Sequence, residues 1–133
     1  MISVCLACYN GGRFIGEQVR SILASPRVSE LLVIDDGSTD HTAQELAAIG
    51  DPRMRLLRGP GRGAVANFEF LLAQAAGQLI FLSDQDDVWL PHKVEAMQQA
   101  LQRADLVVCD CSVVDGELRD LTRILARWDV KPH

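Results

Sequence analysis

Short apolar runs alternate with amphipathic stretches along most of the chain. Residues 2–8 form a continuous apolar run, as expected for a strand buried on both faces of a parallel sheet. Similar runs recur at residues 31–34, 54–57, 79–82 and 106–109. Polar or glycine-rich residues follow each run, so the pattern predicts five strands, of which the one at 54–57 is the weakest.

Between these runs, apolar residues return every three or four positions, which is the spacing of an amphipathic helix. This predicts helices near residues 14–23, 42–49 and 65–76, and a fourth helix that begins at Pro91. Towards the C-terminus the pattern weakens, and residues 118–128 are expected to form a short helix. Strands alternating with helices predict an α/β fold with a doubly wound, mostly parallel sheet.

Composition and charge narrow the class of protein. The chain has 133 residues, 48% hydrophobic and 23% charged, which is typical of one soluble globular domain. A net charge of -5 without a Lys/Arg cluster argues against binding to nucleic acid. No apolar run approaches the roughly 20 residues that span a bilayer, and residues 1–4 lack the basic region of a signal peptide. We therefore expect a cytoplasmic protein.

The four cysteines, Cys5, Cys8, Cys109 and Cys111, are spaced like a weak zinc motif. Both pairs lie in segments predicted to be strands. Residues three apart on a strand face opposite sides, so Cys5 and Cys8 could not bind one metal ion together. We expect four free thiols in a reducing compartment.

Polar residues follow several of the predicted strands. Tyr9 follows the first strand, Asp35 and Asp36 follow the second, and Asp84 and Asp86 follow the run at residues 79–82. Right-handed crossovers place the carboxyl ends of parallel strands at one edge of the sheet, where ligands of open α/β sheets bind. The topology thus predicts a site in which an aromatic ring and several carboxylates meet.

Asp84 and Asp86 are two positions apart, so both point to the same side of an extended segment. Carboxylates crowded in this way repel each other unless one is protonated or a cation bridges them. Oxygen ligands suit Mg²⁺ or Mn²⁺, and such a cation can neutralise a diphosphate leaving group. The alternative is a solvated acidic turn that caps the following helix.

The segment Asp35-Asp36-Gly37-Ser38 also allows two interpretations. Asp, Gly and Ser are ordinary turn residues, so the segment could simply form a turn and a helix cap. In the functional interpretation, an Asp accepts a hydrogen bond from the imide N–H of a nucleotide base. Tyr9 would then stack on that base, whereas its alternative role is to cover the end of the sheet.

Three segments resemble glycosyltransferase family 2, whose members have the GT-A fold. They are Ser3-Val4 with Tyr9-Asn10, the segment Val33-Ile34-Asp35-Asp36-Gly37-Ser38-Thr39-Asp40, and the segment Phe81-Leu82-Ser83-Asp84-Gln85-Asp86-Asp87-Val88-Trp89-Leu90-Pro91. Their order and spacing match the family over about residues 2–115. We interpret residues 1–115 as a nucleotide-sugar-binding half-domain, and residues 116–133 as a C-terminal extension that begins an acceptor-binding part.

The resemblance implies a role for each matched residue. Tyr9 and Asp36, with Asp35 beside them, would hold the nucleotide base. Asp86 would ligate a divalent cation, Mn²⁺ or Mg²⁺, and Asp84 would reach the ribose or the metal. The segment that contains the last two is similar to rhamnosyltransferase-like members, so the implied donor is a UDP- or dTDP-linked sugar.

Two departures from the family pattern stand out. The family often carries an Arg just before the Asn in the helix after Gly63, and here Ala66 precedes Asn67. The carboxylate base with which members deprotonate the acceptor hydroxyl comes from sequence beyond the matched stretch. We therefore assign no catalytic residue and expect only the donor-binding part of an enzyme.

The implied enzyme is an inverting glycosyltransferase that transfers a sugar to a glycan or lipid-linked acceptor in bacterial cell-surface polysaccharide synthesis. Its acceptor would bring it to the inner face of the membrane. An apolar sheet edge left exposed would favour a homo-oligomer. A non-catalytic nucleotide-binding fragment is the alternative within the same family.

Other nucleotide- or metal-binding α/β classes fit the sequence less well. A phospho-receiver signalling domain needs an acidic pair after the first strand, a phospho-accepting Asp after the third and a Lys after the fifth. At these three places the chain has Tyr9-Asn10, Arg58-Gly59 and Asp110-Cys111. A dinucleotide-binding domain needs a G-x-G-x-x-G turn after the first strand, and this turn is absent there. A nucleotidyltransferase needs a basic, glycine-rich segment near the N-terminus. Here Arg13 is the only basic residue close to the glycines at positions 11 and 12.

Overall fold

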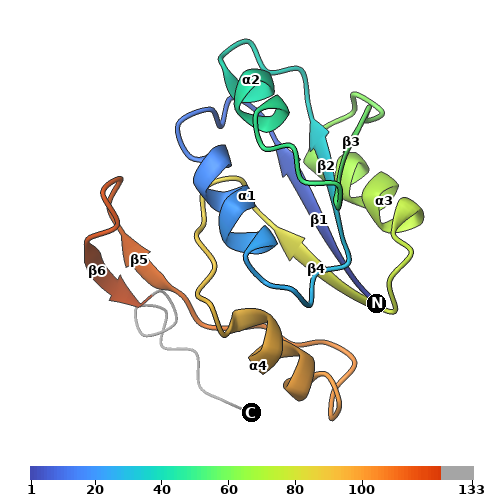
Figure 1. Ribbon diagram of the computed structural model, residues 1–133, viewed down its shortest axis with the longest axis vertical. Coiled ribbons are helices and arrows are strands. Elements are labelled where there is room, and N and C mark those ends of the chain that lie inside the picture. The colour runs from blue at the N-terminus through green and yellow to red at the C-terminus, as the bar shows by residue number, and fades with distance from the viewer. Residues whose placement is uncertain (124–133) are drawn as a thin grey trace. The chain divides into compact units, whose positions relative to one another are not determined.

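The first apolar run forms a central strand of a parallel sheet (Figure 1). In the computed structural model, which describes residues 1–123, the chain divides into two compact units, residues 1–98 and 99–133. The strands of the first unit are β1 (Ile2–Cys8), β2 (Glu30–Asp35), β3 (Met54–Leu57) and β4 (Leu79–Ser83). Their order is β3-β2-β1-β4, and each neighbouring pair is parallel.

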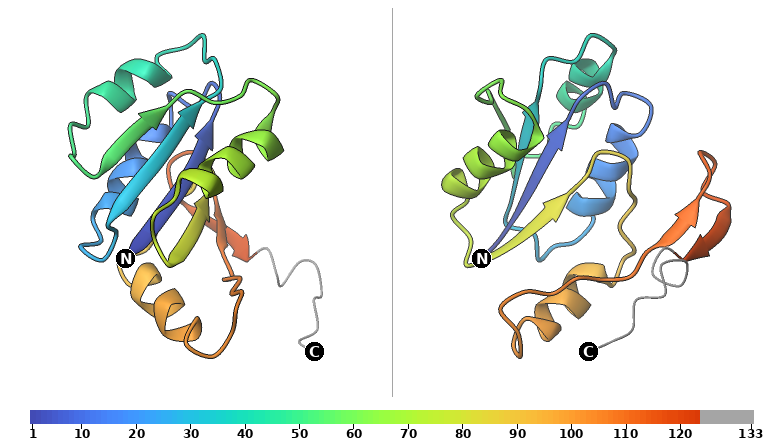
Figure 2. Two further views of the ribbon diagram at one scale, coloured as in Figure 1. Left: turned by 90° about the vertical axis from the view of Figure 1, so that its right-hand side faces the viewer. Right: turned by 180° about the vertical axis from the view of Figure 1, so that it is seen from behind.

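Helices cover both faces of this sheet (Figure 2). They are α1 (Ile15–Leu23), α2 (Thr42–Ala47) and α3 (Ala64–Gln74), and a further helix, α4 (Lys93–Ala100), contains the boundary between the two units. α1 and α2 lie on one face and α3 lies on the other. The predicted doubly wound α/β sheet is therefore confirmed.

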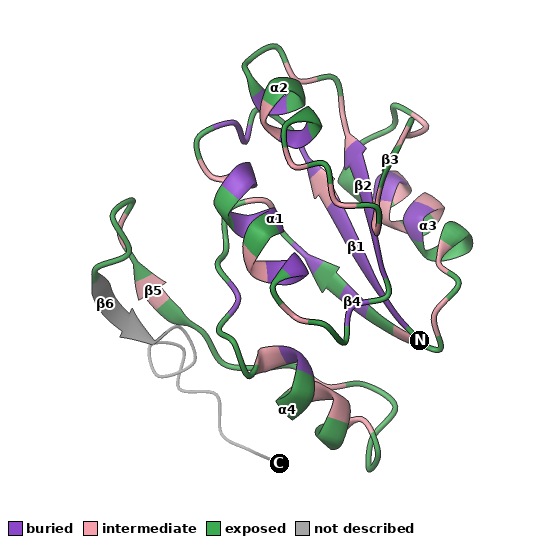
Figure 3. Ribbon diagram, in the orientation of Figure 1, coloured by how far each residue is buried: buried purple, intermediate pink, exposed green. Residues whose placement is uncertain are grey.

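The core consists of two apolar layers, one on each face of the sheet. Val4 and Leu6 of β1 pack on the side of α1, and Cys5 packs on the opposite side with Leu71 of α3. Figure 3 shows the resulting run of buried residues along β1 and β2. Cys8 belongs to the first layer, so it and Cys5 lie on opposite faces, as the strand spacing predicts.

The predicted fifth strand at residues 106–109 is wrong. These residues form no strand, and Leu106 and Val108 are both 80% exposed. A four-residue apolar run becomes a strand only where a neighbouring backbone pairs with it, and the run itself does not specify such a neighbour. The strands that the structure describes in the second unit are instead β5 (Ser112–Val114) and β6 (Asp120–Arg123), which pair antiparallel.

The helix predicted at residues 118–128 is wrong over its described part. Residues 120–123 form β6, and Leu118 has a φ of 63°, which is incompatible with a helix. Asp115 closes the turn between the two strands by accepting hydrogen bonds from the N–H groups of Glu117 and Arg119, each at 2.9 Å. Residues 124–128 lie outside the described part of the chain.

No helix within residues 1–123 is long and apolar enough to cross a membrane.

Candidate functional site

An open cavity of about 360 Å³ lies at the carboxyl ends of β1, β2 and β4. It is lined by Ala7, Cys8, Tyr9, Asp36, Ala64, Asn67, Asp84, Gln85 and Asp86. The structure thus brings together Tyr9, Asp36, Asp84 and Asp86 from three separate loops, at the edge of the sheet where the topology predicts them.

Asp35 is the one predicted residue that does not line this cavity. Its Oδ1 accepts hydrogen bonds from the backbone N–H of Ser38 at 3.1 Å and from the Ser38 hydroxyl at 2.5 Å. Asp35 therefore closes the turn that carries its neighbour Asp36. Asp35 thus has the turn role that the sequence left open, and of the two adjacent carboxylates only Asp36 lines the cavity.

The backbone of Asp36 is held by a hydrogen bond, whereas its side chain lines the cavity. Its N–H donates to the carbonyl oxygen of Cys8 at 2.9 Å, which ties the end of β2 to the end of β1. Its half-buried carboxylate accepts no hydrogen bond from any side chain or backbone group within residues 1–119. The carboxylate is consequently available to a donor on a ligand, such as a base N–H.

Tyr9 is 55% exposed, so a face of its ring is open to a ligand in the cavity. Its backbone N–H donates to Oε1 of Gln85 at 2.8 Å, which joins the loop after β1 to the loop after β4. Gln85 also packs against Gly11, where a Cβ atom would lie 2.6 Å from the same oxygen. A side chain at position 11 would therefore push these two loops apart.

Hydrogen bonds also join the loops after β1 and β2. Asn10 adopts a φ of 48°, and its N–H donates to Oγ of Ser38 at 2.8 Å while its Oδ1 accepts from the N–H of Thr39 at 2.8 Å. The N–H of Gly12 donates to Asp40 at 3.0 Å. Asp40 also accepts from Thr42 at the start of α2, and these hydrogen bonds lower the pKa of the Asp40 carboxyl. This network fixes Tyr9 and Asp36 relative to each other.

Helix α1 holds the loop that carries Asp84 and Asp86. Gln18 is fully buried, and its Nε2 donates to Oγ of Ser83 at 2.5 Å and to the carbonyl oxygen of Asp84 at 3.1 Å. One turn on, Oγ of Ser21 accepts from the N–H of Trp89 at 3.0 Å. Sequence reasoning missed Gln18, although a polar residue on the apolar face of a predicted helix was the signal for it.

The carboxylates of this loop influence one another. Partial removal from solvent raises the pKa of Asp87, the negative charges of Asp86 and Asp84 raise it further, and Lys93 opposes the shift. Asp84 and Asp86 both line the cavity, and a cation held by these two carboxylates would complete its coordination with waters and ligand phosphates, as Mg²⁺ and Mn²⁺ do.

Cys8 lines the cavity as a neutral thiol. Burial, followed by the negative charges of Asp35, Asp40 and Asp36, raises its pKa to about 12. Its Sγ donates to the carbonyl oxygen of Ile34 at 3.4 Å. Burial thus favours the neutral form of the thiol, and Cys8 packs in the apolar layer on the α1 side of the sheet.

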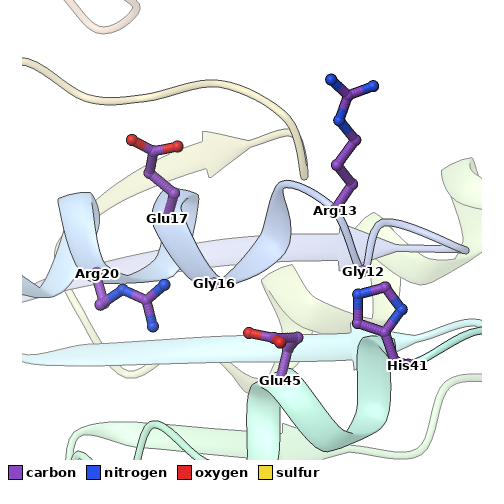
Figure 4. A pocket seen from close by; sticks show the side chains of 7 residues that line it. All are labelled: Gly12, Arg13, Gly16, Glu17, Arg20, His41 and Glu45. Carbon is purple, nitrogen blue, oxygen red and sulfur yellow. The ribbon is translucent and has the colours of Figure 1, made fainter. Parts of the chain in front are cut away.

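A second cavity of about 440 Å³ lies between α1 and α2 and contains none of the predicted residues (Figure 4). It is lined by Gly12, Arg13, Gly16, Glu17, Arg20, His41 and Glu45. Two arginines are balanced by two glutamates, so the lining does not favour a ligand of one charge. Figure 4 also shows Arg13 pointing away from Arg20 and Glu45, so the cations do not converge.

The parallel sheet, its two layers of helices and the acidic cavity at its carboxyl edge define an α/β protein of the GT-A class. The sequence model of glycosyl transferase family 2 matches residues 3–131. The chain therefore belongs to this family, and the resemblance seen in its motifs is confirmed.

Relatives and a solved structure agree with this membership. The UDP-Glc:alpha-D-GlcNAc-diphosphoundecaprenol beta-1,3-glucosyltransferase WfgD of Escherichia coli is 32% identical over 97 residues, covering 71% of this chain and 38% of the relative. The succinoglycan biosynthesis protein ExoO of Rhizobium meliloti is 36% identical over 110 residues, covering 78% and 30%. This chain thus spans only 30–38% of the length of these relatives.

Among solved structures, the chain is similar to glucosyl-3-phosphoglycerate synthase of Mycobacterium tuberculosis. That structure is a complex with Mn²⁺, uridine diphosphate and glucosyl-3-phosphoglycerate. The TM-score is 0.64 at 25% identity, and the match covers 79% of this chain and 40% of the synthase.

Proposed function

We propose that the chain is the donor-binding part of an inverting, metal-dependent glycosyltransferase. In this function it binds a nucleotide-diphosphate sugar, and the whole protein transfers the sugar to an acceptor hydroxyl. The observation that carries the proposal is the single cavity in which Tyr9, Asp36, Asp84 and Asp86 meet, in a chain of glycosyl transferase family 2.

The base of the nucleotide is assigned to the end of the cavity formed by β1 and β2. Tyr9 stacks on the base, and the free carboxylate of Asp36 accepts its imide N–H. Asp35 contributes by holding the turn that presents Asp36. Uracil and thymine carry the same imide edge, so UDP- and dTDP-linked sugars both satisfy this arrangement.

The diphosphate is assigned to the end of the cavity formed by β4. Asp86 ligates a divalent cation, and Asp84 ligates it as well or reaches the ribose. The two carboxylates fit a hard cation that completes its coordination with ligand phosphates. A bound Mn²⁺ or Mg²⁺ supplies the positive charge that stabilises the diphosphate as a leaving group. The complex of the mycobacterial synthase with Mn²⁺ and UDP supports this assignment.

The acceptor and the catalytic base are assigned to sequence outside the cavity described above. The printed names of the relatives, a diphosphoundecaprenol glucosyltransferase and a succinoglycan biosynthesis protein, support a lipid-linked or glycan acceptor. Such acceptors place the whole protein in bacterial cell-surface polysaccharide synthesis, at the inner face of the membrane.

Thermal unfolding with UDP, dTDP, GDP and ADP, each with and without Mn²⁺, tests the donor site. A ligand at about 100 times its dissociation constant stabilises a protein by about 2.7 kcal/mol, which raises Tm by several degrees for a domain of this size. We expect UDP or dTDP to raise Tm, and most of the increase to require Mn²⁺. No increase with any nucleotide would contradict the proposal.

Two charge-neutralising variants sharpen this test. Asp86→Asn should abolish the Mn²⁺-dependent part of the Tm increase, because it removes a ligand of the cation without changing the size of the side chain. Glu69→Gln removes the same charge from an exposed position on α3 outside the cavity and should behave as wild type. If Asp86→Asn also behaves as wild type with Mn²⁺, the metal-ligand assignment is wrong.

A further inference from the structure

Lys93, the first residue of α4, has its ammonium group above the ring of Trp89. Its Nζ lies 4.5 Å from the centroid of that ring, which is a cation–π contact. Trp89 is itself fixed, because it is 5% exposed, packs on Phe81 with 5.8 Å between the ring centroids, and donates its N–H to Oγ of Ser21. The buried ring therefore holds the charge of Lys93 at the end of the loop that follows β4.

The loop after β4 is strongly negative. It contains three carboxylates, Asp84, Asp86 and Asp87, and none of them forms an ion pair within the described part of the chain. Partial removal from solvent, followed by the charges of Asp86 and Asp84, raises the pKa of Asp87, and Lys93 lowers it. Among the groups that act on Asp87, Lys93 is thus the only cation.

Neither ion pairing nor the helix explains a cation at this position. Lys93 forms no ion pair within residues 1–119. The N-terminus of a helix has a partial positive charge, so a basic residue in the first turn of α4 is locally unfavourable. The methylene groups of a lysine can cover an indole ring, but an uncharged side chain would do this equally well. The charge of Lys93 therefore has its effect on the carboxylates of the neighbouring loop.

We propose that Lys93 is a positioning residue that sets the charge around the cation site assigned to Asp84 and Asp86. Before a cation binds, the ammonium group offsets the repulsion among the carboxylates of the loop. The same charge opposes the binding of a free cation and favours the binding of a diphosphate. The inference rests on the proposed donor site and adds to it a residue that does not line the cavity.

This role predicts effects of opposite sign on the two ligands. A positive charge beside the site lowers the affinity for Mn²⁺ and raises the affinity for UDP, and it acts on each ligand whether or not the other is bound. The site then takes up the cation mainly together with the diphosphate. A purely structural role of Lys93 has a different consequence, because loss of local structure weakens the binding of both ligands.

Lys93→Met tests the charge alone, because methionine keeps an unbranched apolar side chain over Trp89. With the full chain, electron paramagnetic resonance of the free ion measures Mn²⁺ binding, and calorimetry at saturating Mn²⁺ measures UDP binding. At low ionic strength, Lys93→Met should bind Mn²⁺ roughly two- to fivefold more tightly than wild type, and UDP roughly two- to fivefold more weakly. Both differences should shrink at high ionic strength, because salt screens the charge.

Two further variants serve as controls. Lys93→Arg keeps the positive charge and the contact with the indole ring, so it should bind both ligands as wild type does. Arg20→Gln removes one positive charge from an exposed position on α1, where the side chain lines the second cavity. It should also behave as wild type, because it changes the net charge of the protein by the same amount as Lys93→Met without changing the loop after β4.

The outcomes distinguish the role of Lys93 from the donor site itself. Weaker or unchanged Mn²⁺ binding by Lys93→Met, or differences that persist at high ionic strength, would overturn the electrostatic role of Lys93 and leave the donor site intact. Failure of wild type to bind UDP in the presence of Mn²⁺ would overturn the donor site and the role of Lys93 together.

Discussion

Tyr9 contributes its backbone and its ring to different functions. The N–H is bound to Gln85 and fixes two loops, while the ring remains exposed in the cavity. A substitution at position 9 can therefore remove the ring and keep the backbone hydrogen bond. This separation allows the stacking contact to be measured by itself.

Tyr9→Ala should weaken UDP binding by the same factor with and without Mn²⁺, because stacking does not depend on the cation. Loss of one aromatic contact of about 0.5–1.5 kcal/mol corresponds to roughly a two- to tenfold higher dissociation constant, measurable by calorimetry. Tyr9→Phe keeps the ring and serves as the control, with wild-type affinity expected. A loss confined to the Mn²⁺-containing titrations would show that Tyr9 acts on the diphosphate end instead.

For single residues, the sequence predicts which side chains lie together at the cavity. It does not predict which of their hydrogen-bonding atoms lack a partner within the protein. Tyr9, Asp36, Asp84 and Asp86 could be predicted because parallel strands bring their carboxyl ends to one edge. The sequence could not show that Asp35 closes the turn while Asp36 lines the cavity, because two adjacent carboxylates have the same chemistry. The burial of Asn67 had no sequence signal, because it depends on the close approach of Gly59 and β2.

Among the elements, α1 has a role beyond covering the sheet. Two of its polar residues, Gln18 and Ser21, hold both ends of the segment from Ser83 to Trp89. The Asp84 and Asp86 loop is therefore positioned by a helix that precedes it by more than sixty residues, as the separations in these hydrogen bonds show. Disturbing α1 should consequently affect the β4 end of the cavity, to which we assign the cation.

Gln18→Met keeps the length of the side chain and removes its hydrogen bonds to the Asp84 loop. The free energy of unfolding should fall by about 1–3 kcal/mol, since buried groups lose their partner, and urea unfolding measures this change. The Mn²⁺-dependent part of UDP binding should weaken although Gln18 does not line the cavity. Gln44→Met, an exposed change on α2, is the matched control. Unchanged Mn²⁺-dependent binding in a folded Gln18→Met protein would contradict this role of α1.

Predictions of elements succeeded for the runs that pair within the four-stranded sheet and failed for the segments after α4. β1, β2 and β4 have buried neighbours that agree with their patterns. Residues 106–109 have the composition of a strand, yet Leu106 and Val108 remain exposed. Whether such a run forms a strand depends on pairing with a backbone segment that is distant in the sequence. A local apolar run contains no information about that segment.

β4 is an edge strand of the sheet in the first unit. Only β1 pairs with β4 in the described part of the chain, so the other edge of β4 presents unpaired backbone groups. Ile80 and Leu82 lie on the face towards α3 and are 37% and 58% exposed, because α3 covers β1 and β2 instead. An unpaired edge beside exposed apolar side chains favours association with another chain.

We therefore expect this 133-residue chain to self-associate as its concentration rises, which light scattering measures directly. Leu82→Lys should reduce the association, since an inward-facing charge on an edge strand opposes pairing. Leu72→Lys alters an exposed apolar residue of α3 and is the control. A monomer at every concentration tested would exclude association through β4.

The hydrogen bonds that join the three loops of the cavity also determine how the sequence can be exchanged between related proteins. A chimaera whose junction falls between Asn10 and Gln85 would take Tyr9 from one parent and its supporting glutamine from the other. A junction after Trp89 would inherit all the described lining of the cavity from one parent, together with the contacts of α1 that hold its last loop. A graft with its junction just after Trp89 should therefore transfer the cavity and the contacts that support it as a unit.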